Sequence, residues 1–548
     1  MLYVAIAVLF EHPAIAHLNS VCACTSASTD PTQYMWSMVW FPYAILHGLN
    51  PLVTHEIWVA PGGFDLAGAT STPAEALIAW PVTAIAGPLV AFNILTTLAP
   101  AVGAWFAYRL CLYVTRSPAA SILGGYLFGF SSYEFGQLLG HLHLTVVFAV
   151  PAAVLLTLKR IDGVIGARRY VLLMALVLAF QLLTSSEVLV TLTGMGILAL
   201  GCALLLSDPP DRRRIAAVLP ELAGAYGVMA VVCSPFIYYE LTGPAITGGP
   251  YSADALSFFI PNVLTHLGAQ QFLAVSSAFP GNTSEQGTYL GLPLIAIVAG
   301  YAIARWREPA TRILLAVLGL AVIWSLGDHL YIDGHRTIRL PWIAFWHLPG
   351  LKLLITIRIG MYIALLCAVI AALWLSAPSR HAARRWLLAA VSVAALFPNI
   401  GARNAGVRTS VFQTSYPTPA FFATDLYRRY LRRDEIVLPL PYGGSSYGVS
   451  LLWQARTDMY FRLASGSFGY TPPSYPEPIA YELTQQMPLT ANAPSLLRSF
   501  IATERVSAVV ADPVHSGPWL GVLARLGLHP VSAGGVLVYR IPRGWRFI

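Results

Sequence analysis

Charged side chains are scarce in this sequence. Only 11% of its 548 residues are charged, whereas soluble domains carry roughly a quarter. Hydrophobic residues make up 56% of the chain, and the mean hydropathy is +0.64. This deficit of charge excludes an ordinary soluble protein and indicates a polytopic α-helical membrane protein. The formal net charge of +8 does not indicate nucleic-acid binding, because the basic residues lie mainly in short connections between apolar runs.

Cysteine is also rare, with six in the chain. Cys22 and Cys24 are separated by Ala23 alone, a spacing too tight for an ordinary disulfide, and no other metal-ligand pattern lies nearby. We therefore expect these two to have a structural role. The other four fall inside apolar runs and are predicted to pack there: Cys111, Cys202, Cys233 and Cys367.

Apolar runs long enough to cross ~30 Å of hydrocarbon as helices recur along most of the chain. The piece 74–87, broken by Pro81 and Gly87, fits a half-helix or a separate short span. Met1 is followed at once by apolar residues without a basic leader, which favours a start site placed too late, or a short tilted helix, over a signal peptide. Eleven runs are predicted to be transmembrane helices, near residues 2–18, 88–114, 119–136, 143–159, 170–185, 187–206, 215–237, 288–305, 311–326, 357–376 and 385–399.

Arg and Lys gather in or beside alternate connections between these runs. The positive-inside rule therefore places those connections in the cytoplasm. The loops 19–87, 238–287 and 327–356 then face outward, as does the tail after residue 400. The sequence predicts a multispan domain over residues 1–400, with its long loops on the outer side of the membrane.

The segments that are predicted to face outward include aromatic stretches and a C-terminal part of soluble composition. Residues 34–41 form an aromatic stretch that is predicted to lie along the membrane interface as an amphipathic helix, and residues 341–354 are predicted to form a second interfacial or a re-entrant helix. Residues 401–548 have a soluble composition and predict a small extracytoplasmic α/β domain. Its strands are expected near 435–440 and 506–511, and its helices near 494–504 and 519–526.

The order of several short stretches resembles that of the GT-C glycosyltransferases, multispan enzymes that use polyprenyl-phosphate-linked sugars, and is most similar to their bacterial YfhO-like branch. The similarity covers most of the chain as an ordered pattern, although no single stretch is diagnostic. The stretches are Asp30–Tyr34, Gly48–Pro51, Pro61–Gly63, Phe128–Tyr133, Gly140–Leu144, Glu285–Pro293 and Leu348–Gly350 with the segment on to Arg358.

The resemblance implies a catalytic carboxylate in the first outer loop, and Asp30 occupies that position. Many members of the family have two adjacent acids there, whereas Asp30 is followed by Pro31. As a general base, Asp30 would take the proton of the acceptor hydroxyl, a contribution of ~10²–10⁴-fold. The implied protein is a hexosyl or pentosyl transferase of the bacterial plasma membrane that acts on an envelope glycan, glycolipid or protein. The chain has no P-loop, Rossmann glycine pattern or nucleotide-sugar motif, which agrees with a lipid-linked donor.

The leaving polyprenyl phosphate requires cationic or dipolar partners. Arg358 is the first candidate, because it begins an apolar run at its outer end, where a charge needs a partner. Lys352 and Arg336 are nearby in the sequence and are further candidates. The alternative is that these cations extend toward lipid headgroups.

Polar residues near the outer ends of the spans are candidates for lining the substrate site. Glutamates there are equally suited to cap a helix or to pair with a cation, and for Glu187, which follows Ser185 and Ser186, helix capping is favoured. Polar lining is also favoured over metal binding for the two histidines, and assistance by a divalent cation is left open. The candidates are Glu134, His141, His143, Glu240, Glu285 and Tyr289.

Two functions of other classes compete with the transferase. A lipid-linked glycan transporter or flippase would show internal repeats and polar residues at the bilayer midplane, whereas here no repeat is found and the polar residues cluster at the outer face. A catalytically silent envelope scaffold is the third possibility, and it would tolerate the loss of Asp30.

Overall fold

The computed structural model divides into two compact units, each of which is described by itself. Unit 1 comprises Met1–His12, Thr96–Ser234 and Thr247–Phe412, and unit 2 comprises Pro13–Leu95, Pro235–Ile246 and Gln413–Ile548. The structure describes the whole chain except residues 26–29, 60–61, 245–250, 269–270, 346–350, 352–353, 404–409, 444–447, 469, 471, 473–478, 480–481, 484–488 and 548.

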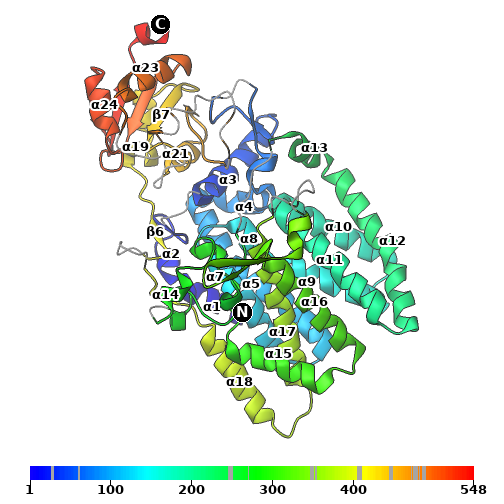
Figure 1. Ribbon diagram of the computed structural model, residues 1–548. Coiled ribbons are helices and arrows are strands. Elements are labelled where there is room, and N and C mark those ends of the chain that lie inside the picture. The colour runs from blue at the N-terminus through cyan, green and yellow to red at the C-terminus, as the bar shows by residue number, and fades with distance from the viewer. Residues whose placement is uncertain are drawn as a thin grey trace. The chain divides into compact units, whose positions relative to one another are not determined.

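Long apolar helices dominate the chain (Figure 1). Among the described residues, six helices are long and apolar enough to cross a membrane: Pro88–Thr115 (α5), Leu142–Ile161 (α8 and α9), Ala167–Thr184 (α10), Ser186–Leu206 (α11), Pro209–Val232 (α12) and Thr356–Ser376 (η7 and α17). Three shorter apolar helices are Pro73–Ala86 (α4), Leu292–Arg305 (α15) and Pro309–Ser325 (α16). Several of the predicted runs form shorter or broken helices, so the helices of the structure do not confirm the count of eleven spans, which stays a prediction.

The broken runs lie mostly in unit 1. The run 2–18 forms two helices, and the run 119–136 is interrupted after Gly129. A Cβ at Gly129 would lie 2.4 Å from Pro100 O and 2.5 Å from Ala104 Cβ, so only glycine lets these helices approach so closely. The helices concerned are Leu2–Phe10 (α1), His12–Ala16 (α2), Pro118–Gly129 (α6), Ser132–Gln137 (α7) and Ala382–Ala395 (α18).

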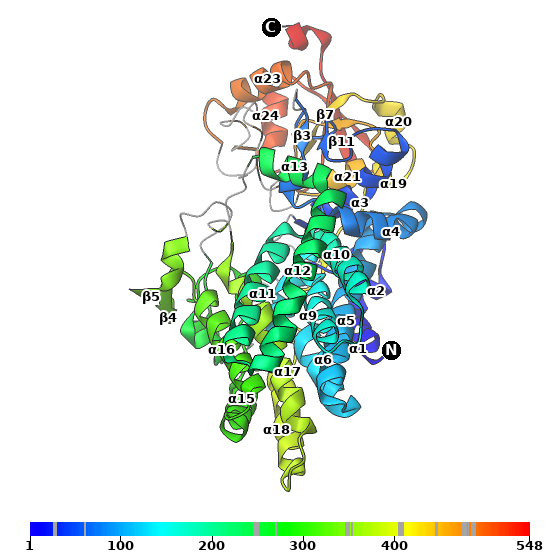
Figure 2. The same ribbon diagram turned by 90° about the vertical axis from the view of Figure 1, so that its right-hand side faces the viewer.

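The bundle of unit 1 is built from neighbouring helices. Helix α10 packs on α12, α11 on α16, and α17 on both α6 and α16, and Figure 2 shows α11, α12 and α16 running side by side. Short elements of unit 1 carry the polar residues of interest. They are α7, Ala255–Phe258 (η2), His266–Gly268 (η3), Leu273–Ser276 (α14), Thr283–Glu285 (η4), His329–Ile332 (β4), His335–Arg339 (β5), Pro341–Phe345 (η5) and Thr356–Ile359 (η7).

Unit 2 contains a five-stranded sheet of order β10-β11-β9-β7-β8. Strand β7 (Ile436–Leu440) is parallel to β8 (Arg462–Leu463) and to β9 (Ala508–Ala511), and Val437 pairs with both Leu463 and Ala508. Strand β11 (Val536–Arg540) is antiparallel to both β9 and β10 (Pro530–Ala533). All of β9 and most of β7 are buried, as expected for central strands with both faces covered.

The helices of this region are amphipathic. Helix α23 (Ala493–Thr503) buries Leu497, Phe500 and Ile501, and α24 (Trp519–Arg525) buries Trp519, Val522 and Leu523. Both sets follow the i, i+3, i+4 spacing of one helix face. The predicted strands at 435–440 and 506–511 and the predicted helices at 494–504 and 519–526 are thus confirmed. The boundary of the predicted domains at residue 400 and the outer position of residues 401–548 stay predictions.

Residues 13–95 and 235–246 form the rest of unit 2, and the first of these ranges includes the loop 19–87, which is predicted to face outward. Residues Asp30–Leu46 form α3, which packs on α4 and on α21 (Ser450–Arg456). The expectation that 34–41 is amphipathic is wrong, because every side chain from Pro31 to Met38 is buried. The remaining elements are Val21–Cys22 (β1), Val53–Thr54 (β2), Phe64–Asp65 (β3), Ala67–Ala69 (η1), Ser234–Thr242 (α13), Thr414–Ser415 (β6), Ala420–Ala423 (α19), Tyr427–Tyr430 (α20) and Arg543–Phe547 (η8).

Cys22 and Cys24 form a disulfide, so the expectation that their spacing prevents one is wrong. Their Cα atoms are 5.3 Å apart, within the range that a disulfide spans. The buried Asn93 amide holds this segment: it accepts from Ala23 N–H at 2.9 Å and donates to the carbonyls of Leu18 and Val21. Disulfides persist in oxidising compartments, which agrees with the predicted outward position of this loop.

Candidate functional site

Asp30 is the first residue of α3 and is partly exposed. Its Oδ1 accepts a hydrogen bond from Gln33 Nε2 at 3.2 Å, one turn along the helix. The amide groups at a helix N-terminus favour a negative charge, so the local structure suits a carboxylate. The proline at 31 fits the first helical turn, where its missing N–H is not needed.

The helix that carries Asp30 is fixed in unit 2 by hydrogen bonds to α21 and its flank. Trp36 Nε1 donates to Gln454 Oε1 at 2.6 Å, and Thr32 Oγ1 donates to Gly448 O at 3.1 Å. Gln454 Nε2 in turn donates to the carbonyls of Glu56 and Phe461, at 2.9 and 2.7 Å. These side chains are buried, so the bonds anchor α3 without competition from water.

A separate charged cluster lies in unit 1 around Arg358 in η7. Its guanidinium makes two contacts to Glu285, from Nε at 3.1 Å and from Nη2 at 2.5 Å, and its Nη1 pairs with Glu187. The side chain of Glu285 is 2% exposed, and those of Arg358 and Glu187 are 14% and 21% exposed. One cation therefore faces two carboxylates in a largely dry environment.

The carboxylates differ in their remaining partners. Glu187 Oε1 also accepts from the backbone N–H of Ile355 at 3.2 Å, while the N-cap of its helix is Ser185, whose Oγ accepts from Val188 N–H. The expected capping role of Glu187 is therefore wrong, and its carboxylate instead links α11 to η7. For Glu285, burial opposes ionisation, but the Arg358 charge and hydrogen bonds outweigh it and hold the pKa of this carboxyl below its usual value.

The two predicted histidines lie beside this cluster. His141 Nδ1 contacts Gln137 Oε1 at 2.8 Å, and Gln137 Nε2 donates to Ser284 O at 3.1 Å. The rings of His141 and His143 are 6.2 Å apart and nearly perpendicular. Within the part of the chain that the structure describes, no group of three or more His, Cys, Asp or Glu side chains is arranged to hold a metal ion.

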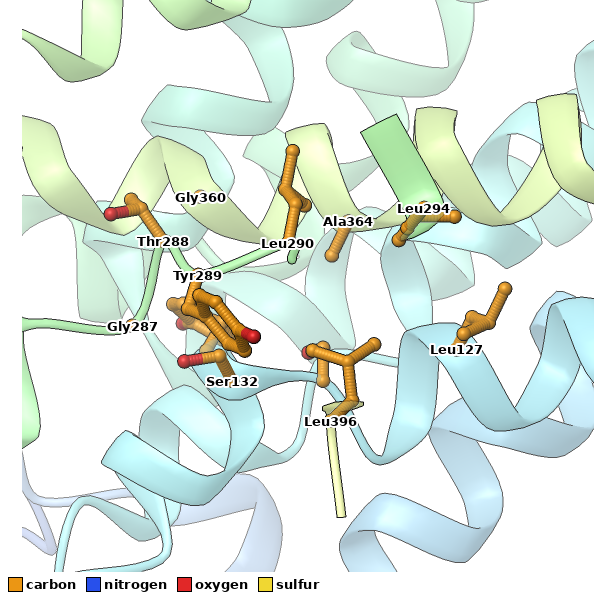
Figure 3. A pocket seen from close by; sticks show the side chains of 12 residues that line it. Leu127, Ser132, Gly287, Thr288, Tyr289, Leu290, Leu294, Gly360, Ala364 and Leu396 are labelled. Carbon is orange, nitrogen blue, oxygen red and sulfur yellow. The ribbon is translucent and has the colours of Figure 1, made fainter. Parts of the chain in front are cut away.

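Glu134 and Tyr289 lie near the same segments. Glu134 is 2% exposed in α7, and its Oε1 has no hydrogen-bond partner among the described residues. Tyr289 lines a small, mostly apolar pocket in unit 1, where its ring lies next to Ser132, and Leu127, Leu290, Leu294 and Leu396 also line the pocket (Figure 3). The pocket adjoins the charged cluster along the chain, since Gly287 and Gly360 line it and lie two residues from Glu285 and Arg358.

The structure brings together Arg358, Glu285, His141 and His143, with Glu134 and Tyr289 near the same segments, and it does not bring Arg336 or Glu240 to this cluster. Arg336 lies on β5, with its Nη2 2.8 Å from the His329 ring and 3.8 Å from Asp328. Glu240 belongs to α13 in unit 2. Lys352 lies outside the described residues.

Sequence reasoning missed three residues. Glu187 was assigned to capping, and Gln137 carries no signal beyond its place one turn before His141. Arg456, at the end of α21, has a buried Nε without a hydrogen-bond partner among the described residues. A cation directly after the mostly apolar stretch Leu451–Ala455 was a visible signal.

Solved structures with this fold are glycosyltransferases. The arabinofuranosyltransferase AftD from Mycobacteria matches 98% of this chain with a TM-score of 0.57 at 14% identity, and the match covers 41% of AftD. The archaeal oligosaccharyltransferase AglB from Archaeoglobus fulgidus matches 99% of this chain and 74% of its own, at 13% identity and a TM-score of 0.50. ArnT from Cupriavidus metallidurans matches 99% of this chain and 98% of its own, at 11% identity and a TM-score of 0.50. This chain thus spans less than half the length of AftD and nearly all of ArnT.

The family comparison also covers more than half of the chain, but the matching family has no described function. No curated protein matches the chain. One family model, described as a domain of unknown function (DUF6311), matches residues 1–348, which include Asp30 and the Glu187 and Glu285 carboxylates. The structural matches show the GT-C glycosyltransferase fold, while the YfhO-like branch stays a prediction. The chain is a membrane protein of the GT-C fold and belongs to the DUF6311 family.

Proposed function

We propose that this chain is a membrane glycosyltransferase that moves a sugar from a polyprenyl-phosphate-linked donor to an extracytoplasmic envelope glycan, glycolipid or protein, with Asp30 as general base. The observation that carries the proposal is the extent of the fold match: three glycosyltransferases each align with 98% or 99% of the chain. A match of this extent includes the helices and the first outer loop together. The membrane is proposed to be the bacterial plasma membrane.

The donor class follows from the same relatives. The AglB structure contains a dolichol-phosphate, a polyprenyl phosphate, and AftD is named as an arabinofuranosyltransferase. The six long apolar helices give this chain the bilayer contact that a lipid-linked donor requires. A hexosyl or pentosyl group is the proposed cargo.

Asp30 supplies the chemistry that the acceptor needs. As the new glycosidic bond forms, the acceptor hydroxyl loses its proton, and a carboxylate within hydrogen-bond reach accepts it. The first turn of α3 holds the Asp30 carboxylate at the N-terminal end of a helix that is anchored by buried hydrogen bonds. A fixed base contributes about 10²–10⁴-fold, which corresponds to about 3–5 kcal/mol of the activation barrier.

The cluster around Arg358 serves as a scaffold within unit 1 in this proposal. A phosphate role for Arg358 would require its guanidinium to exchange a carboxylate for the ligand, because Glu187 and Glu285 occupy it. The phosphate roles of Arg358, Lys352 and Arg336 stay predictions. So do the lining roles of Glu134, His141, His143, Glu240, Glu285 and Tyr289.

The test compares wild type with Asp30→Asn in nanodiscs, using a panel of polyprenyl-phosphate sugars and endogenous envelope acceptors. Asp65→Asn is the matched control: Asp65 is a carboxylate of the same outer loop and unit, and its Oδ1 accepts from Ala67 N–H at 2.9 Å, a bond that asparagine retains. Transfer that falls about 10²–10⁴-fold in Asp30→Asn alone supports the proposal. Equal transfer by Asp30→Asn and wild type refutes Asp30 as the base.

A further inference from the structure

Arg456 is a partly buried cation with no counter-ion among the residues that the structure describes. Its Nε is buried and has no hydrogen-bond partner, and among the described residues no carboxylate lies within ion-pair distance of its guanidinium. Arg358 differs, because two carboxylates neutralise it. Arg336 differs as well, because it contacts Asp328 and His329 and its side chain is 58% exposed.

An unpaired guanidinium away from water is unfavourable, since it loses hydration without gaining a partner. The burial lowers the pKa of Arg456, yet arginine stays charged in proteins. The charge and the five N–H donors therefore remain available to a ligand. A phosphate suits them, because two of its oxygens accept parallel hydrogen bonds from the guanidinium fork.

The position of Arg456 connects it to Asp30 within unit 2. Gln454, two residues before Arg456, bonds Trp36 of α3, and Gly448 bonds Thr32, the third residue of that helix. The guanidinium lies against Gly87, where a Cβ would be 3.2 Å from Nη1 and 3.7 Å from Cζ. Gly87 joins α4 to α5, and α4 packs on α3. The cation on α21 thus lies against the junction of α4 and α5, and both α21 and α4 pack on α3, the helix that carries Asp30.

We propose that Arg456 binds the phosphate of the lipid-linked donor, in the unit that carries Asp30. This inference rests on the proposed function for the identity of the donor, but the cation itself is independent of it. It assigns the phosphate to a residue beyond the matched family region 1–348. A phosphate anion has two sources at a membrane, a polyprenyl phosphate and the headgroup of an anionic phospholipid.

The experiment measures binding and needs no turnover, so a failure of the proposed transferase function does not obscure it. Undecaprenyl phosphate is titrated into full-length protein in phosphatidylcholine nanodiscs, and phosphatidylglycerol is titrated in parallel. The variants are Arg456→Gln, Arg456→Lys and Arg312→Gln. Arg312 is the matched control, because its Nε is also buried without a partner, but it lies in a predicted cytoplasmic connection.

The expected result is a loss of undecaprenyl phosphate affinity of about tenfold or more in Arg456→Gln, the scale of a charge-assisted hydrogen bond. A smaller loss is expected in Arg456→Lys, and no change in Arg312→Gln. An equal, Arg456-dependent affinity for phosphatidylglycerol supports phosphate binding but identifies the source as a headgroup. Unchanged binding of both lipids by Arg456→Gln overturns the proposal.

Stability gives a second readout that separates a binding role from a structural one. Removing an unpaired buried charge relieves its desolvation, so ligand-free Arg456→Gln is expected to melt at the wild-type temperature or above. Added undecaprenyl phosphate is expected to stabilise wild type and not the variant. Destabilisation of ligand-free Arg456→Gln, together with unchanged stabilisation by the lipid, overturns the proposal.

Discussion

Arg358→Gln removes the single cation from a cluster that holds two carboxylates. In wild type the guanidinium contacts Glu285 through Nε and Nη2 and Glu187 through Nη1. Glutamine keeps a polar side chain of moderate length but has no charge. The variant leaves Glu285, which is 2% exposed, and Glu187 facing each other without a counter-charge.

The magnitude follows from two opposing contributions. At an effective dielectric constant of about 20, each contact of opposite charges near 4 Å is worth about 4 kcal/mol. Desolvation of each buried ion costs several kcal/mol, so the intact cluster adds little net stability. Loss of one partner of a buried pair costs about 3–5 kcal/mol. Because Arg358 serves two carboxylates, we expect Arg358→Gln to lie at the upper end of that range.

The assay is thermal unfolding of the purified protein in detergent, followed by the loss of monodisperse protein on size exclusion. Arg305→Gln is the control, since it removes an exposed i,i+3 pair with Glu308 that is worth about 0.3–0.5 kcal/mol. Glu285→Gln added to Arg358→Gln should recover part of the loss, because only one carboxylate then remains. If Arg358→Gln melts like Arg305→Gln, the cluster does not contribute as described.

Acid weakens the pair of Glu285 and Arg358 within the same cluster. The folded-state pKa of Glu285 lies below its usual value because Arg358 outweighs the burial. Its contribution to stability is therefore fully present above the unfolded pKa of about 4.3 and is lost as the pH falls through the lower folded value. Wild type should lose stability in that window, whereas Glu285→Gln should lose less. Parallel melting curves of the two proteins across acid pH would contradict this assignment.

Two further predictions concern unit 2. Burial raises the pKa of Glu56 to about 7, so the folded state favours the protonated form of this side chain. The free energy of unfolding therefore falls by up to about 3 kcal/mol as the pH rises from about 4.5 to 7. Glu56→Gln should remove this pH dependence from melting curves, and an unchanged slope would refute the prediction. The Cys22–Cys24 disulfide should protect both thiols from alkylation until reductant is added, as read by peptide mass spectrometry. Alkylation of both without reductant would show that the bond is absent.

Local patterns predicted the parts of the fold that depend on neighbours in the sequence. The alternation and apolar runs around Val437 and Val509 gave strands, and the i, i+3, i+4 spacing around Phe500 gave a helix, because these periods are set by backbone geometry. Local patterns did not predict where the helices of the apolar runs are interrupted. Hydropathy does not reveal that a run is interrupted, as after Gly129, where close packing on Pro100 and Ala104 decides the helix geometry.

The charged cluster could not be derived from the sequence. Glu187 and Arg358 are 171 positions apart, and Glu285 and Arg358 are 73 apart, so only the tertiary fold pairs them. Local context pointed the other way, since a serine and a glutamate at a helix start indicate capping. Arg358 was correctly identified as a charge that needs a partner, but the described partners are carboxylates.

As the proposed glycosyltransferase, this chain cleaves the bond between a sugar and a polyprenyl phosphate, and the most direct measurement is the release of that phosphate. Purified wild type and Asp30→Asn are incubated with a panel of polyprenyl-phosphate sugars and membrane acceptors, and free polyprenyl phosphate is quantified by mass spectrometry. The account predicts acceptor-dependent release by wild type that is about 10²–10⁴-fold slower in Asp30→Asn. Binding of a donor by wild type without any release of polyprenyl phosphate would contradict it.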